Sequence, residues 1–526
     1  MPIVNIPIQM GLGAESGRHD WIDRIPENML VVPKEVLNSK GYMRSFPGLT
    51  AVGGNTGGLS RGAVFNTETG VGYRIFGESI VAVSSLGGEI GPTGVLATAI
   101  GTNGEYVPMP YHTDRSSGTH GLIHYQGYLQ FRNSGGEVQG ALKWVQIETR
   151  ADGTHYHVTD YQFQQNPAMN AFNVSTGKNG DPALLSDIAD AVRHKARYIV
   201  LPRNSIGFLI SALITTSGQN SSSATPVFAI TDPTAPIVAG DLSLGPILGL
   251  DVWRDYVVAF NRNSVQFFNL TGDASEPYIV NQAMTVRTGV VGRTAKCHFM
   301  GGFACLGAPK EKPISIYFVT QGRYEEIATR YIQKIIEDER GQPDFDQAFL
   351  EPVQYYEHEL LLVHLPTTTL CFDGVSKQWS ELFSNSSRTM PYQGIHHIYN
   401  GQRWTVASKN QNLTGVLDHT NTLNFGEKVS HTLYSQMIQV RNKRLYDLDI
   451  DGVFGQDGEN INIGLSYTLD GLTYSPEEWI NYSVQNDRTK RVLKRRLGYV
   501  QNNIGFRLRI LGNQPITVSN LRVRVE

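Results

Sequence analysis

A short apolar hairpin pattern recurs along the middle of the chain and restricts the folds that it can adopt. Each copy has two apolar runs, rich in aromatic residues and joined by a turn, as in GVGYRIFGESIVAV and WRDYVVAFNRNSVQFF. Such runs are typical of β-hairpins. Seven apolar markers, one in each copy, are 44 to 70 residues apart: Tyr73, Tyr128, Tyr198, Tyr256, Phe303, Leu360 and Trp404. Four-stranded propeller blades repeat at roughly 40 to 50 residues. We therefore expect a mainly β chain with a β-propeller of six or seven irregular blades, and two packed sandwiches are the alternative.

The pattern changes after about residue 418. Runs at 445–454, 461–471, 505–512 and 516–525 alternate apolar and polar residues, as in half-buried antiparallel strands. They predict a separate β-sandwich-like platform domain. Segments 184–197 and 324–339 have apolar residues at helical spacing and predict short or partial helices between strands.

The N-terminal stretch predicts a stiff, irregular arm. Pro33 and Pro47 restrict the backbone, while Gly41 and Gly48 allow turns. The apolar run at 29–32 must be buried against something. Because chain termini commonly lie close together, the simplest arrangement packs the arm on the C-terminal domain. The expected division is an arm at 1–60, a propeller at 61–425 and a platform domain at 426–526.

Composition limits the functional classes. The 526 residues include 54 glycines, 24 prolines and only 18% charged residues, with a net charge of −3. A dedicated nucleic-acid binder would be strongly basic, so any DNA contact should be local. Cys297, Cys305 and Cys371 lack metal or redox spacing and predict buried free thiols made in a reducing compartment. The sequence has neither a secretion signal nor a membrane-spanning apolar stretch, so a soluble, unsecreted protein is expected.

Candidate metal and catalytic patterns are incomplete. The aspartates at 447, 449 and 451 begin like a calcium loop, but its position twelve would be Gly458, so a half-exposed strand is the better interpretation. Four histidines could gather around a metal, but their spacing does not require it: His120, His124, His155 and His157. The sequence contains no G-x-S-x-G, P-loop or H-E-x-x-H motif. We expect no enzyme activity, no metal and no cofactor.

A basic cluster near the C-terminus is the sharpest electrostatic feature. Six cations fall within nine residues: Arg488, Lys490, Arg491, Lys494, Arg495 and Arg496. Four more follow on expected strands: Arg507, Arg509, Arg522 and Arg524. Such a run can face solvent, DNA phosphate or an acidic protein surface. Arginine alternation in FRLRI and LRVRV favours carboxylate pairing across an interface, because guanidinium groups bind carboxylates directionally.

Several blocks carry a family resemblance. The runs MPIVNIPIQMGLG and IPENMLVVPKEVLNSKGYMRSFPG resemble the N-terminus of the packaged-DNA stabilization proteins of short-tailed bacteriophages, the tail hub or nozzle subunits. Later blocks at 253–272, 358–366 and 487–510 resemble that family in the same order. The resemblance spans nearly the whole chain and is weakest at 134–181 and 217–226. It also implies that part of 184–197 is a blade strand.

The resemblance implies a structural protein of the virion tail, made in the host bacterial cytoplasm. Such proteins form a ring, expected to be a hexamer, below the portal and its adaptor. The ring closes the filled head together with a needle or plug protein, stabilises packaged DNA, extends the ejection channel and helps attach tailspikes or fibres. DNA would pass through it without sequence-specific binding, and no membrane anchor is implied.

Docking of this ring would use the arm and the basic cluster. A channel that must release DNA should not hold it by many phosphate contacts, so a subunit or adaptor interface is favoured over DNA for these cations. The candidate interface residues are Pro33, Lys34, Arg44, Phe46, Pro47, Arg488, Lys490, Arg491, Lys494, Arg495, Arg496, Arg507 and Arg509. The alternative function is a carbohydrate-binding or glycan-degrading propeller.

Overall fold

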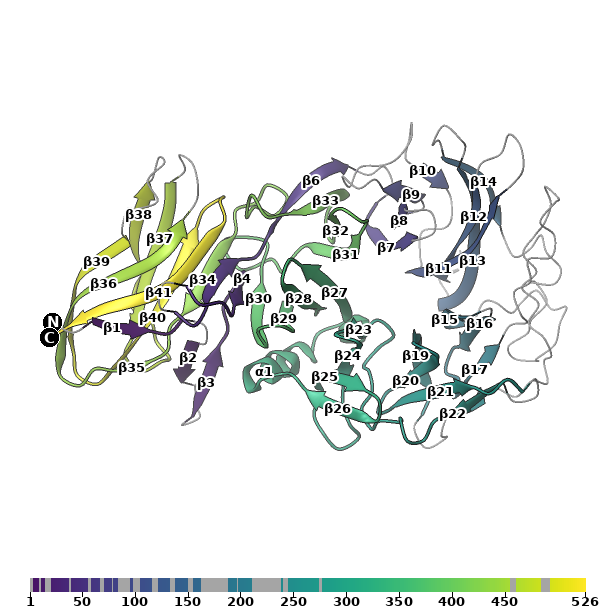
Figure 1. Cartoon of the computed structure of the whole chain (residues 1–526), viewed down its shortest axis with the longest axis horizontal. Coiled ribbons are helices and arrows are strands. Elements are labelled where there is room, and N and C mark those ends of the chain that lie inside the picture. The colour runs from purple at the N-terminus through teal and green to yellow at the C-terminus, as the bar shows by residue number, and fades with distance from the viewer. Residues whose placement is uncertain are drawn as a thin grey trace.

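The structure is a computed structural model, and its description covers most of the chain. The described residues are 3–8, 11–14, 20–36, 39–54, 58–66, 71–77, 79–83, 95–97, 105–115, 122–132, 138–149, 155–161, 188–195, 197–210, 238–239, 245–273, 277–454, 460–483 and 492–526. Two β-rich bodies lie side by side, a large ring of sheets and a smaller pair of sheets that holds both chain ends (Figure 1).

Within the described residues, seven four-stranded antiparallel sheets form the ring. Blade one contains β7 (Ser60–Asn66), β8 (Val71–Phe76), β9 (Ser79–Val83) and β10 (Val95–Ala97). Blade two contains β11 (Glu105–Arg115), β12 (Leu122–Arg132), β13 (Val138–Thr149) and β14 (His155–Tyr161). Blade three contains β15 (Ile188–His194), β16 (Arg197–Pro202), β17 (Gly207–Ile210) and β18 (Val238–Ala239). Blade four contains β19 (Ile247–Trp253), β20 (Tyr256–Asn261), β21 (Val265–Leu270) and β22 (Tyr278–Val280).

The last three blades have the same strand order. Blade five contains β23 (Lys296–Phe299), β24 (Gly302–Gly307), β25 (Ser315–Thr320) and β26 (Arg323–Glu326). Blade six contains β27 (Phe349–Tyr355), β28 (His358–His364), β29 (Thr369–Asp373) and β30 (Gln378–Leu382). Blade seven contains β31 (Gly394–Tyr399), β32 (Trp404–Ser408), β33 (Leu413–Asp418) and, from the N-terminal arm, β6 (Gly48–Gly54).

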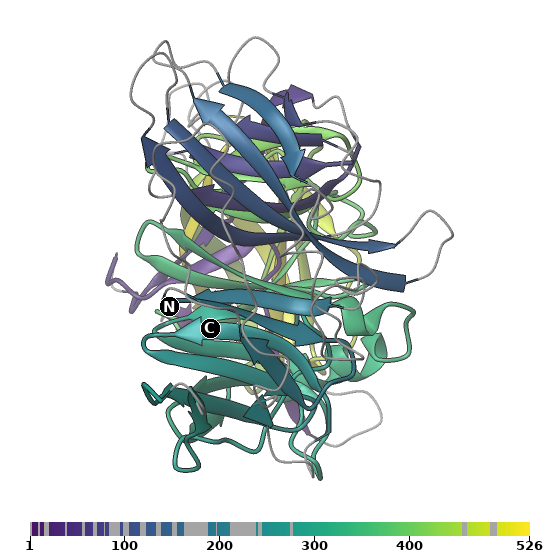
Figure 2. The ribbon, with the colours of Figure 1, turned by 90° about the vertical axis from the view of Figure 1, so that its right-hand side faces the viewer.

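The ring is closed twice. The first strand of blade seven contacts the first strand of blade one, as β31 lies against β7. In addition, β6 precedes blade one in sequence but pairs with β33 as the outermost strand of blade seven. Figure 2 views the ring from the side of blades two and three, with the sandwich behind it. Because the outer strand comes from the arm, opening the ring requires breaking a complete strand pairing.

The second body is a sandwich of two sheets. One sheet has the order β39 (Val492–Val500), β36 (Lys443–Phe454), β41 (Ile516–Val525), β5 (Tyr42–Ser45) and β4 (Met29–Val32), with β1 (Ile3–Ile6) also on β41. The other has β34 (Ser430–Tyr434), β40 (Asn503–Leu511), β37 (Asn460–Thr468) and β38 (Glu478–Ser483), with β35 (Ile438–Gln439) on β40. A hairpin of β2 (Gly11–Ala14) and β3 (Trp21–Arg24) lies beside it. The predicted fold class, a mainly β propeller with a β-sandwich, is confirmed.

The helix predictions were partly wrong. Segment 184–197 contributes β15 and the start of β16 among its described residues, because its apolar side chains are buried between blades. In segment 324–339, only α1 (Arg330–Glu339) is helical, and the segment begins as β26. Thr329 caps the helix, and Ile332 and Ile336 face the core. The short 3-10 helix η3 (Phe345–Gln347) follows. No helix in the described part of the chain is long and apolar enough to cross a membrane.

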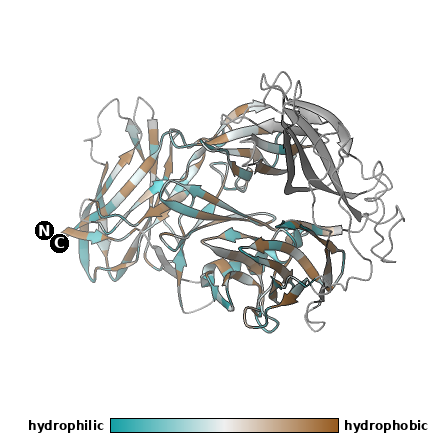
Figure 3. Cartoon of the chain, turned by 45° about the vertical axis from the view of Figure 1, so that its right-hand side comes forward, coloured by the Kyte–Doolittle hydropathy of each residue, from teal (hydrophilic) through white to brown (hydrophobic). Residues whose placement is uncertain are grey.

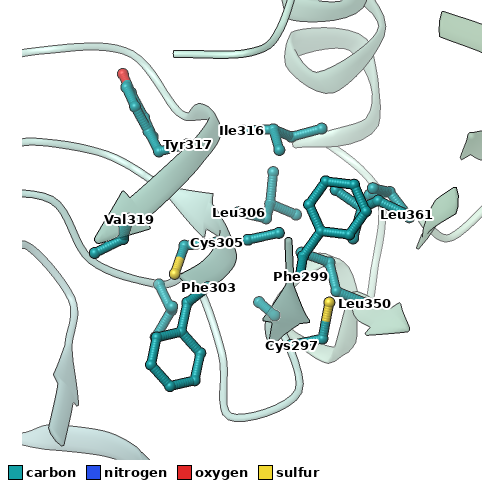
Figure 4. Close-up of a cluster of buried hydrophobic side chains, with 14 of the residues drawn as sticks. Cys297, Phe299, Phe303, Cys305, Leu306, Ile316, Tyr317, Val319, Leu350 and Leu361 are labelled. Carbon is teal, nitrogen blue, oxygen red and sulfur yellow. The ribbon is translucent and has the colours of Figure 1, made fainter. Parts of the chain in front are cut away.

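Hydrophobic and hydrophilic positions alternate along strands of both bodies (Figure 3). The buried apolar side chains of these strands form the cores. The largest cluster joins blades four, five and six, and Figure 4 shows its centre around Phe299, Leu306 and Leu361. Cys297, Cys305 and Cys371 are free and buried, as predicted. Burial raises the pKa of all three thiols, so they remain protonated and act as small apolar side chains.

Candidate functional site

Strand β4 of the arm separates two hydrophobic cores. Met29 and Val31 belong to the sandwich core, while Leu30 between them belongs to the core of blades six and seven. Successive side chains of a strand point to opposite faces, so one short strand can contribute to both cores. The arm therefore lies between propeller and sandwich and packs against both.

Asn28, just before β4, connects three parts of the chain. Its Nδ2 donates to the Ser430 carbonyl of the sandwich at 2.9 Å, and its Oδ1 accepts from the Phe383 N–H of blade six at 2.9 Å. The Asn28 carbonyl accepts from the Phe46 N–H and lies 3.0 Å from Nδ1 of His431. Asn28 is buried and has φ 53°, a left-handed conformation that asparagine tolerates better than most residues. The junction is thus held by directional hydrogen bonds as well as by apolar packing.

A buried acidic pair lies beside this junction. Glu27 accepts from Arg388 at 2.8 Å and from the Tyr434 hydroxyl at 3.1 Å. Burial, and next the negative charge of Glu27, raise the pKa of the nearby Glu381 to about 7. Arg388 of blade six therefore offsets the charge that the arm brings into the interior.

The arm residues predicted for an interface fall into two groups. Pro33 and Lys34 are exposed, whereas Phe46 and Pro47 are buried within the chain. The ring of Phe46 packs edge-on against Tyr392 at 5.5 Å. Arg44 is half-buried, with its guanidinium 5.5 Å and 5.1 Å from the ring centres of Tyr355 and Tyr356 of blade six.

The described arginines of the C-terminal strands contact carboxylates of their own chain. Arg507 and Arg509 of β40 both contact Glu477, at 3.2 Å and 2.8 Å. Arg522 contacts Asp449 and Asp451 of β36, and Arg524 contacts Asp447 at 3.3 Å. The three aspartates of the calcium-like sequence are thus on a strand and face guanidinium groups. The described residues contain no group of side chains arranged to hold a metal.

The described part of the basic cluster lies on β39, an edge strand of the sandwich. Lys494 pairs with Glu478, whereas Arg495 and Arg496 are exposed and have no ion pair within the described residues. Asp447 is the cross-strand neighbour of Arg495, but it pairs with Arg524. Tyr499 on the same strand is 62% exposed. Arg488, Lys490 and Arg491 lie outside the described residues, as do His120 and the end of the calcium-like loop; the side chains of His124, His155 and His157 are also not described.

Buried polar contacts join neighbouring blades, and sequence reasoning did not find them. Asp190 accepts from the Leu250 N–H at 2.8 Å between blades three and four, and Lys296 contacts Asp251 at 3.0 Å between blades four and five. Burial raises the pKa of Asp190 to about 6. Burial also opposes ionisation of Asp251, but Lys296 and His298 hold its pKa well below the usual value.

The seams around blade seven are held by larger buried groups. Glu351 of blade six contacts His397 of blade seven at 2.8 Å. Arg74 of blade one donates to the carbonyls of His396 and Thr405 at 2.8 Å and 2.7 Å. Burial lowers the pKa of Arg74 to about 9, which still leaves it charged at neutral pH. The contacting residues are hundreds of positions apart or on different blades, so no local pattern marks them.

Comparison with known proteins agrees with the two-body architecture. The chain matches the family described as Bacteriophage P22 Gp10, beta-propeller, over residues 4–422, and the one described as Bacteriophage P22 Gp10, beta-sandwich, over residues 430–526. The tail hub protein gp10 of Salmonella phage P22 is 28% identical over 533 residues, covering 100% of both chains.

Two solved structures that match this chain are much less similar to it. An exo-beta-1,3-galactanase from Phanerochaete chrysosporium is 10% identical, covers 91% of this chain and 100% of its own, and has a TM-score of 0.25. The Cps50 (Swd1) beta-propeller domain of Myceliophteria thermophila is 9% identical, covers 60% of this chain and 96% of its own, and has a TM-score of 0.24. Scores this low carry no inference about activity. The two family matches together cover almost the whole chain, and the chain therefore belongs to the Bacteriophage P22 Gp10 family, with that family's β-propeller followed by its β-sandwich.

Proposed function

We propose that the chain is a structural tail hub subunit of a phage virion. The observation that carries this proposal is the alignment with a tail hub protein at 28% identity, which covers 100% of both sequences. In this role the protein has no turnover. It assembles as a ring, expected to be a hexamer, beneath the adaptor-loaded portal, closes the filled head together with a needle protein, extends the ejection channel and provides attachment surface for tailspikes.

The way in which the arm joins both bodies supports a mechanical role. A subunit that resists the outward pressure of packaged DNA must not separate into its two bodies under load. Here the arm completes blade seven through β6 and also joins the sandwich sheet through β4 and β5. A force that separates propeller from sandwich must therefore break the strand pairing and core packing of the arm with one of the two bodies, together with the Asn28 hydrogen bond to that body.

The edge strand β39 is the proposed contact with a neighbouring subunit or with the adaptor. Edge strands with exposed backbone groups readily pair with other chains, and exposed cations control which partners approach. On this edge, Arg495 and Arg496 supply two charges that have no ion pair among the described residues, and Tyr499 supplies an exposed aromatic ring. Most of the other described arginines in this sandwich already contact carboxylates, so they stabilise the platform. Pro33 and Lys34 are exposed after β4, at the opposite edge of the same sheet, and are a separate candidate surface on the arm.

Particles provide the direct test of the hub role. Phage lacking this protein are expected to package DNA and then lose it, with DNA retention measured by nuclease protection and electron microscopy. The purified full chain is expected to bind adaptor-loaded portal rings and to add a symmetric density below them. Particles that keep their DNA and mature normally without the protein would refute the proposal.

A matched pair of charge reversals tests the β39 contact. The double variant Arg495→Glu and Arg496→Glu is expected to reduce binding to adaptor-loaded portals at least about tenfold, since like charges at an interface cost several kcal/mol. Lys310→Glu and Lys312→Glu changes the net charge equally at an exposed propeller loop and should bind normally. Equal loss in both doubles would assign the effect to net charge and contradict the proposed contact.

A further inference from the structure

Two cavities on the propeller share a wall formed by β27 of blade six. One, of about 1120 Å³, lies between blades six and seven, and the other, of about 460 Å³, lies between blades five and six. Both are lined by Pro352 and Gln354, which are the exposed residues of that strand. The two cavities therefore adjoin along β27, and together they are called the groove here.

Aromatic faces dominate the wider part of this groove. Tyr356, in the turn after β27, is 56% exposed, and Tyr399, at the end of β31, is 46% exposed. The ring of Tyr399 lies 5.6 Å from that of Trp404 across the hairpin turn. The ring of Tyr356 is held between the Arg44 guanidinium at 5.1 Å and His419 at 5.8 Å. These rings are fixed platforms, so a ligand that stacks on them loses little side-chain entropy of the protein.

Polar groups along the same groove are also held in place. Asp418 accepts from the Thr50 hydroxyl and the Thr420 N–H, both at 2.8 Å. It also accepts from the Thr420 hydroxyl at 2.6 Å and the Asn421 amide at 2.7 Å, so both carboxylate oxygens are occupied and the side chain is fixed. In the turn beside Tyr399, the Asn400 side chain accepts from the Arg403 N–H at 3.2 Å. The groove thus combines flat aromatic surfaces with a carboxylate, a guanidinium and the amides of Gln354 and Gln402, which also line it. Sugar rings need this combination, because they present apolar C–H faces and hydroxyl groups that both donate and accept.

Other occupants fit the groove less well. The wider cavity has one carboxylate, Asp418, and one guanidinium, Arg403, so it lacks the excess positive charge that a phosphate-rich polymer requires. An added peptide strand would need backbone donors along β27, and Pro352 in that strand has no N–H. We propose that this groove binds a neutral oligosaccharide without cleaving it, with Tyr356, Tyr399 and Trp404 as stacking platforms. The exposed side chains of Gln354, Gln402 and Arg403 would form hydrogen bonds with its hydroxyl groups.

Binding to defined sugars tests this inference independently of the hub role. The labelled full chain is applied to an array of neutral and acidic oligosaccharides, and the best neutral ligand is titrated by calorimetry. Tyr399→Ala is expected to weaken binding about tenfold, which corresponds to the loss of one stacked aromatic contact. Tyr399→Phe should stay within about twofold, because it retains the ring. Tyr356→Asn, which suits the φ of 52° at that turn, should also weaken binding.

The control is Tyr467→Ala, an exposed tyrosine of the sandwich that should leave sugar binding unchanged. Thermal unfolding verifies that each variant folds. Failure to bind any neutral sugar, a preference for acidic sugars, or equal affinity of Tyr399→Ala and wild type would overturn the inference. Portal binding by the same Tyr399→Ala protein is expected to be normal, so failure of this inference and failure of the hub proposal give different results.

Discussion

Nδ1 of His397 in blade seven lies 2.8 Å from Oε1 of Glu351 in blade six. The same carboxylate contacts Nε2 of His364 at 2.7 Å and accepts from the His397 N–H at 2.8 Å. Burial alone would raise the pKa of Glu351, but His397 and His364 hold it well below the usual value. The seam therefore contains a buried charge whose partners come from two blades, next to the blade that the arm completes.

Removing this carboxylate should weaken the propeller. Glu351→Ala is expected to lower the free energy of unfolding by about 3–5 kcal/mol, because it leaves buried imidazole groups without their acceptor. The measurement is urea denaturation of the purified chain. Glu337→Ala, at an exposed position of α1, should change stability by less than about 0.5 kcal/mol. A Glu351→Ala loss as small as that of the control would show that the seam is held by apolar packing alone.

The sequence predicted features that depend on neighbouring residues. Alternation along 445–454 and 516–525 specified β36 and β41, and the apolar run at 29–32 indicated an arm that must be buried. The run did not reveal that Leu30 faces a different core from Met29 and Val31. That division depends on which two bodies meet at the arm, and this information is absent from the local pattern.

Long-range pairing was the part that the sequence could not supply. Glu351 and His397 are separated by 46 residues and Arg74 and Thr405 by 331, and no spacing rule connects them. The same limit applied to Arg507, whose alternation with apolar residues suggested a partner across an interface, whereas Glu477 of the same chain contacts it. The helix prediction for segment 184–197 was wrong because short apolar runs fit both the helical and the strand periodicity. Packing between blades selected the strand.

Asn28 should control docking of the sandwich on the propeller. Asn28→Gly keeps the left-handed backbone and removes the hydrogen bonds to Ser430 and Phe383, so we expect a loss of about 2–4 kcal/mol. Cleavage of the arm by a protease should also accelerate. Asn204→Gly is the matched control, since Asn204 is exposed with φ 55°. Equal stability of the two variants in urea would contradict the role of the Asn28 side chain.

His431 should make the junction sensitive to acid. Burial lowers the pKa of His431 to about 4, although its bond to the Asn28 carbonyl opposes the shift, and its Nε2 is buried without a partner in the described residues. Between the unfolded pKa of roughly 6.5 and the folded value, only the unfolded state binds the proton, so stability falls as pH decreases through this window.

The variant His431→Gln removes this titration. Between pH 7.5 and pH 5, wild type is expected to lose about 2 kcal/mol more unfolding free energy than His431→Gln, as linkage over that window requires. Urea denaturation at each pH measures the difference. His419→Gln, at an exposed position, should follow wild type. Parallel pH profiles for wild type and His431→Gln would exclude His431 as the source of acid sensitivity.

Gly307 marks a close backbone approach between blade five and the segment that leads into it. A Cβ at this position would lie 1.8 Å from the Gly289 carbonyl oxygen, and a Cβ on Gly289 would lie 2.1 Å from the Asn261 carbonyl oxygen. Gly307→Ala must therefore displace backbone, and a cost of more than about 3 kcal/mol is expected, because overpacking strains a closely packed interior. Gly53→Ala provides a control of opposite sign: nothing lies within 4 Å of the added Cβ, so it should be neutral or stabilising by about 0.5 kcal/mol. Thermal melting measures the midpoints of both variants against wild type. An unchanged midpoint for Gly307→Ala would mean that the two segments can separate without loss of the blade core.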